Sequence, residues 1–124
     1  MSGPTLINMR TYTIRHVEQA YLAGVIAAGH TRSRKIGVVA PWAAPQSVAE
    51  INAFALGAQS VDERITTQVL WTGARANAAV EIAAARALAK RGADVLLATT
   101  ASVAVAQWVE SKQLQVRVIG WHVD

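Results

Sequence analysis

The sequence alternates short runs of β-branched and apolar residues with longer stretches of helical periodicity. This alternation is typical of α/β proteins, in which parallel strands form a sheet and the intervening helices cover its faces. We predict about four strands, at 36–40, 65–71, 94–99 and 115–120. The last two are almost wholly apolar, as expected of strands that are covered by helices on both faces. The predicted fold class is therefore α/β, a parallel sheet flanked by helices.

The segments between these strands carry helix start and stop signals. Pro45 and Ser47 can begin a helix after the first strand, and we expect its inward face to comprise Val48, Ile51, Ala55 and Ala58. Asn77 is a candidate N-cap for the next helix, whose inward residues are expected to be Val80, Ala84, Ala87 and Leu88. That helix should stop at Gly92, because glycine readily adopts the left-handed conformation that follows a helix.

Two further helices complete the pattern. One runs from about residue 16 to residue 29, after a possible strand at 11–14, and the other begins at Ser102. We expect residues 1–10 to form a loosely ordered leader and residues 11–124 to form a single α/β lobe. The first residues lack the basic start and apolar stretch of a secretory signal, so from the sequence alone we expect the location to be unknown or cytoplasmic.

The composition narrows the functional classes. The chain has 124 residues, 52% of them hydrophobic, which is enough for one compact domain with a core. Its net charge is +4, but the only tight basic group is Arg32, Arg34 and Lys35, which we interpret as a solvated loop and not as a nucleic-acid surface. Cysteine is absent, which excludes disulfides and thiolate metal sites. Because the basic residues are otherwise scattered, we predict no nucleic-acid partner.

Aromatic and polar residues follow the predicted strands. Trp42, Trp71 and Trp121 fall at or just beyond strand ends, where their flat faces can stack on a ring. Parallel α/β sheets bind ligands beyond the carboxyl ends of their strands. We predict a small-molecule site at this edge, and its candidate residues are Trp42, Arg75, Asn77, Thr100, Ser102, Trp121, His122 and Asp124. Because the sequence stops at the same edge, we expect half of a cleft, and an exposed tryptophan face also predicts dimerisation.

Signatures of catalysis are poor. His122 beside Asp124 is the one candidate acid–base pair near this edge, and the sequence has no Gly-x-Ser-x-Gly, phosphate-loop or dinucleotide-binding motif. The carboxylates are dispersed and do not have metal-ligand spacing. We predict a binding module with no catalytic residues, no metal and no cofactor.

Four short motifs in register carry a family resemblance. They are Tyr-Leu-Ala-Gly at 21–24, Thr-Arg-Ser-Arg-Lys-Ile-Gly at 31–37, Ile-Asn-Ala-Phe-Ala-Leu-Gly-Ala at 51–58 and Gly-Ala-Asp-Val at 92–95. In this order and spacing the chain, from about residue 12 to residue 124, resembles the basic membrane protein family of substrate-binding lipoproteins. Its characterised members capture purine nucleosides for ABC importers. The resemblance implies the second lobe of a two-lobed type I periplasmic-binding, Rossmann-like fold, with the nucleoside in the cleft between the lobes.

The resemblance also implies partners and a location. The partners would be a nucleoside-like small molecule, an ABC permease, and the missing first lobe or a second copy of the chain. The location would be the periplasm or the cell surface, as a membrane-associated lipoprotein. Our leading hypothesis is a substrate-binding component of an ABC transporter, a single-lobe fragment that forms one wall of a nucleoside cleft. The alternative is a truncated ligand-sensing, regulatory or interaction module of the same fold.

The chain departs from the family pattern at three places. It has Arg-Ala-Asn-Ala at 75–78, where relatives tend to have an aromatic residue and an acid, and Ala101 where many relatives have Asp. The closing Gly-Tyr-Asp-Ser-Asp motif appears as Gly-Trp-His-Val-Asp at 120–124. Carboxylates commonly hold ribose hydroxyls. Losing these acids therefore bears directly on whether a nucleoside binds, or on which one.

Overall fold

The computed structural model describes residues 17–100, 104–112 and 115–120, and it contains alternating helices and strands. In chain order these are α1 (Val17–His30), β1 (Lys35–Ala40), α2 (Pro45–Val61), β2 (Thr66–Trp71), α3 (Ala78–Lys90), β3 (Val95–Ala98), α4 (Ala104–Ser111) and β4 (Arg117–Gly120). The predicted α/β class is confirmed. The leader expected at 1–10 and the possible strand at 11–14 lie outside the described residues.

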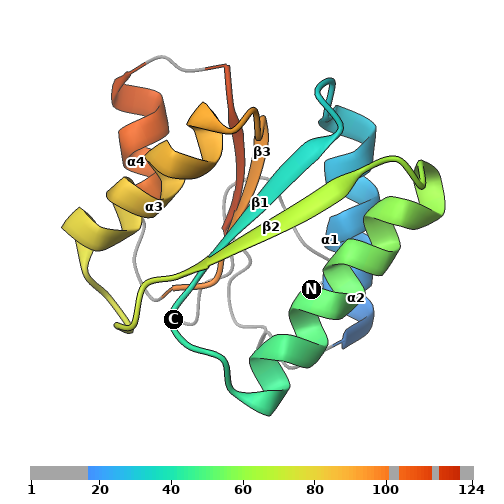
Figure 1. The fold of residues 1–124 in the computed structure, drawn as a ribbon, viewed down its shortest axis with the longest axis horizontal. Helices are drawn as coiled ribbons and strands as arrows, with labels where there is room; N and C mark the ends of the chain where they lie inside the picture. Colours follow the sequence, from blue (N-terminus) through green and yellow to red (C-terminus); the bar gives the residue numbers. More distant parts are fainter. Residues whose placement is uncertain (1–16, 101–103, 113–114, 121–124) are drawn as a thin grey trace.

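The strands form one parallel sheet in the order β2-β1-β3-β4. The chain first moves from β1 outward to β2, then returns to the other side of β1 for β3 and β4. The order therefore reverses between β1 and β3, and in open α/β sheets such a switch point opens a crevice at the carboxyl ends of the strands. In Figure 1, α1 and α2 cover one face of the sheet, and α3 and α4 cover the other.

Alternate strand residues supply two separate cores. Along β1, Ile36 and Val38 point to the side of α1 and α2, whereas Val39 points to the side of α3 and α4. Along β3, Leu97 and Leu96 divide in the same way. All five side chains are at most 3% exposed, so both central strands are buried on both faces. This burial explains why these strands are apolar runs in the sequence.

The core between the sheet and α1 and α2 depends on an unusually close approach of these two helices. A Cβ atom added at Gly24 would lie 2.0 Å from the carbonyl oxygen of Phe54, and one added at Gly57 would lie 2.0 Å from that of Tyr21. The two helix backbones are therefore in direct contact, which only glycine at these positions permits. Small residues complete the contact, because Ala20, Ala23, Ala27 and Ala58 are all almost fully buried.

Some predicted details are wrong. The strands are slightly displaced from their predicted bounds, and β3 and β4 are shorter than expected. Val48 and Val80, predicted to face inward, are both 38% exposed. Each lies in the first turn of its helix, and in α3 the inward positions belong to Glu81, Ala84, Ala85 and Leu88. Among the described helices, none combines the length and apolarity that spanning a bilayer requires.

Candidate functional site

Backbone hydrogen bonds join the loops at the carboxyl edge of the sheet. The amide of Thr72, just after β2, donates to the carbonyl of Ala40 at 2.8 Å, and the amide of Gly73 donates to that of Pro41 at 2.6 Å. On the other side of β1, the amide of Thr99 donates to the carbonyl of Val39 at 3.0 Å. The segments after β1, β2 and β3 are therefore connected along the carboxyl edge, which includes the switch point between β1 and β3.

Two tryptophans lie on this surface with much of their side chains accessible. Trp71 is the last residue of β2 and pairs in register with Ala40, and Trp42 follows two residues beyond that alanine. Trp42 is 47% exposed and Trp71 is 42% exposed. Trp108, on α4, packs against the core between the sheet and α3 and α4, and the guanidinium of Arg86 lies 5.8 Å from its ring centroid. Trp42 and Trp71 thus offer exposed indole surface at the carboxyl edge.

A buried carboxylate connects two of the loops. Asn77 is the N-cap of α3, because its side-chain oxygen accepts from the amide of Val80 at 3.2 Å. The Glu81 carboxylate accepts from the Asn77 amide at 2.9 Å through one oxygen and from the Thr100 hydroxyl at 2.9 Å through the other. Both Glu81 and Thr100 are fully buried. Glu81 therefore holds the start of α3 against the loop that follows β3.

The structure brings together part of the predicted site. Trp42, Arg75 and Asn77 are exposed at the carboxyl edge, whereas the Thr100 hydroxyl donates inward to Glu81. The other predicted residues lie outside the described part of the chain: Ser102, Trp121, His122 and Asp124. Sequence reasoning missed Glu81. The sequence signal was weak, because Glu81 lies four residues after the N-cap Asn77, one residue further than the acid of a capping box.

A second feature lies at the opposite, amino edge of the sheet. A hollow of about 660 Å³ is lined by residues from the end of α1, the following loop, Asp94 and the start of β4. The Asp94 carboxylate accepts from the Thr31 hydroxyl and from the amides of Arg32 and Ser33, at 2.7 and 3.0 Å for the amides. Sequence reasoning placed Arg32 in a solvated loop and Asp94 at the start of a strand, and did not bring them together.

The pKa of Asp94 reflects this environment. Partial burial raises the pKa of the carboxyl, but the hydrogen bonds from Thr31, Arg32 and Ser33 outweigh that effect, so the pKa lies below its ordinary value. These bonds join two segments more than 60 residues apart in the sequence. Asp94 thus anchors the loop after α1 to the start of β3.

Topology and loop arrangement together define the class of protein. A parallel sheet with a central switch point, two helices on each face and a connected carboxyl edge is one lobe of the type I periplasmic-binding fold. A solved structure supports this assignment. The solute-binding protein of an ABC transporter system from Conexibacter woesei superposes with a TM-score of 0.70 at 25% identity, over 84% of this chain and 34% of that one.

Sequence comparisons identify the family. Residues 5–124 match the profile of the Bmp family, described as PnrA-like ABC transporter substrate-binding proteins, and the chain belongs to this family. It is 36% identical over 103 residues to a purine-binding protein of Brucella abortus, covering 83% of this chain and 29% of that protein. It is 40% identical over 89 residues to a putative ABC transporter glucose-binding protein of Haloferax volcanii, covering 72% of this chain and 23% of that protein. The chain thus spans less than a third of the length of these two relatives.

Proposed function

We propose that this chain forms one wall of the ligand cleft of an ABC-transporter substrate-binding protein, and that the ligand is a purine nucleoside. The observation that carries the proposal is the connected carboxyl edge of the sheet, where Trp42, after β1, and Trp71, at the end of neighbouring β2, are both exposed. An indole face accepts a purine ring by stacking. Membership of the family and the similarity to a purine-binding protein favour the same ligand class.

The polar residues of this edge would complete the contacts. In this proposal Arg75 and Asn77 hydrogen-bond the ligand, and Thr100 acts indirectly, since its hydroxyl is directed to Glu81. The predicted roles of Ser102, Trp121, His122 and Asp124 as hydrogen-bonding or stacking residues remain part of the proposal. No step of catalysis is included, because substrate-binding proteins hold their ligand without transforming it.

The partners follow from the two-lobed architecture. We propose that a first lobe, or a second copy of this chain, closes over the same edge, and that an ABC permease receives the ligand. The proposed location is the periplasm or the cell surface. Closure of two lobes normally buries the ligand, so one wall alone is expected to bind weakly.

Calorimetric titration with adenosine, guanosine, inosine and glucose tests the proposal. We expect a dissociation constant weaker than micromolar for at least one nucleoside and no heat with glucose. Trp42→Ala should weaken nucleoside binding by about 3- to 10-fold through lost stacking. Trp108→Phe, which changes a tryptophan away from this edge, is the matched control and should leave affinity unchanged.

Two results would contradict the proposal. Submicromolar nucleoside binding by a demonstrated monomer would refute the single-wall argument, because a lone lobe would then suffice. Glucose binding that also depends on Trp42 would assign the edge to sugars instead, as in the name of the Haloferax volcanii relative.

A further inference from the structure

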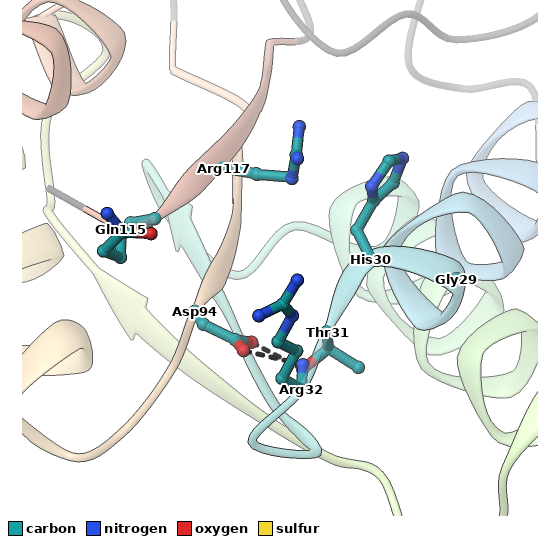
Figure 2. Close-up of a pocket in the computed structure, with 8 residues that line it drawn as sticks. Gly29, His30, Thr31, Arg32, Asp94, Gln115 and Arg117 are labelled. Atoms are coloured by element: carbon teal, nitrogen blue, oxygen red, sulfur yellow. Dashed lines mark hydrogen bonds between the residues drawn. The ribbon is translucent and has the colours of Figure 1, made fainter.

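We propose that the hollow at the amino edge of the sheet binds the phosphate group of a small molecule. This site lies at the end of the strands opposite to the proposed nucleoside edge and does not depend on the function proposed above. Figure 2 shows the side chains of His30, Arg32 and Arg117 extending into the hollow from the end of α1, the following loop and the start of β4. Three separate elements thus direct nitrogen groups into one space.

The charges of the hollow are unbalanced in favour of an anion. The ion pairs within the described part of the chain are Arg34 and Arg64 with Asp62, so neither Arg32 nor Arg117 has a carboxylate partner there. Asp94 is the carboxylate lining the hollow. Both of its oxygens already accept hydrogen bonds from the loop after α1. Among the described residues, the two guanidinium groups are therefore left available to a ligand.

The chemistry of these groups favours phosphate over carboxylate. One arginine fork can occupy both oxygens of a carboxylate, which would leave the second guanidinium without a partner. A phosphate group presents three strong acceptor oxygens and a charge of about −1.5 to −2 at neutral pH, so it can bridge both guanidinium groups. At about 660 Å³ the hollow also has room for the molecule that carries the phosphate.

The end of α1 makes the site dependent on the arginines. α1 terminates at His30, so its carbonyl end carries partial negative charge toward this edge and opposes an anion. Attraction to a phosphate must therefore come from the side chains. Arg32 and Arg117 are both exposed, so variants at either position should fold.

The test is an NMR titration of the chain with inorganic phosphate, with sodium chloride adjusted to hold the ionic strength constant. We expect saturable shifts at the amides of Thr31, Arg32 and Arg117, and weaker, non-saturating effects with acetate. Ribose 5-phosphate should produce the same shifts, whereas ribose should not. This arm distinguishes a phosphorylated metabolite from free phosphate, because a site for the former binds the ester more tightly.

Matched variants decide whether the arginines form the site. Arg32→Ala and Arg117→Ala should each weaken phosphate binding about tenfold, the effect of one lost charge-assisted hydrogen bond. Arg91→Ala removes the same charge just after α3, outside the hollow, and should change affinity less than about twofold. Equal losses in all three variants, acetate binding as tightly as phosphate, or no saturable shift would each overturn the proposal.

Discussion

The contact between α1 and α2 permits a sharp prediction, because one chemical change has opposite expected effects at two positions of the same helix. In Gly24→Ala the new Cβ would lie 2.0 Å from the Phe54 carbonyl oxygen, and real Cβ contacts are essentially never shorter than 3.0 Å, so the helices must separate by at least 3.0 − 2.0 = 1.0 Å. The obstacle is backbone, which cannot rotate away. In Gly29→Ala the new Cβ meets nothing within 4 Å.

The magnitudes follow from packing and helix propensity. Overpacking a core costs about 1–3 kcal/mol, and we take the upper end because the clash is with backbone. Replacing glycine by alanine in a helix gains up to about 1 kcal/mol. We therefore expect Gly24→Ala to lower the free energy of unfolding by about 2 kcal/mol, and Gly29→Ala to raise it by about 0.5 kcal/mol, near the helix end.

Urea unfolding followed by circular dichroism measures both values. In thermal unfolding followed by the same signal, the melting temperature of Gly24→Ala should fall by about 6–10 °C, at roughly 3–5 °C per kcal/mol for a domain of this size. Gly57→Ala should cost a similar amount, because its Cβ would lie 2.0 Å from the Tyr21 carbonyl. The double variant should lose less than the sum, since one separation of the helices relieves both clashes. Wild-type stability in Gly24→Ala would refute the reasoning, as would equal losses at Gly24 and Gly29.

Three further predictions concern the two edges of the sheet. Glu81→Ala should lower the free energy of unfolding by about 2–4 kcal/mol, because it leaves the Thr100 hydroxyl without its buried acceptor; exposed Glu110→Ala is the control, and a loss below about 1 kcal/mol would contradict the assignment. Asp94→Asn should be less stable than wild type at pH 7. The pKa of Asp94 is lowered in the folded chain, so the ionised carboxylate contributes to the free energy of unfolding above the unfolded pKa of about 3.9. That contribution disappears as the pH falls further, and the urea midpoints of the two proteins should therefore converge in acid. A constant difference between the midpoints down to pH 2 would refute this. Finally, sedimentation analysis should show a concentration-dependent dimer that Trp42→Ser weakens, and a clean monomer at high concentration would count against dimerisation through this edge.

The order of helices and strands was readable from the sequence because it depends on local patterns. Strands buried on both faces are apolar runs, and Gly92, with φ of 100°, stops α3 as its position after Lys90 and Arg91 predicts. The inward faces of the helices were harder to predict from the sequence. Helical spacing places Val80 with Leu88, but the first turn of α3 leaves Val80 exposed and directs Glu81 inward. A carboxylate in a helix usually indicates a solvent-exposed position. Only the structure shows that Glu81 is buried, where it accepts hydrogen bonds from Asn77 and Thr100.

The candidate site was readable only where it depends on one strand end at a time. Trp42 and Asn77 could be placed at the carboxyl edge because each follows a recognisable strand. The internal role of Thr100 could not, since it depends on Glu81, which lies 19 residues away in the sequence. The hollow at the amino edge could not be predicted for the same reason. Arg32, Asp94 and Arg117 come from three distant segments, and no local pattern connects them.

The two edges are joined by strands that also separate them. β3 has only four residues between Asp94 and Thr99, a length of about 13 Å at 3.3 Å per residue. Asp94 holds the loop after α1 at one end, and Glu81 holds the loop after β3 at the other through Thr100. Both anchors are carboxylates, and each accepts hydrogen bonds from two segments of the chain or from a loop distant in the sequence. The sheet sets the spacing between the two edges, and each of these side chains ties a loop to the element beside it at one edge.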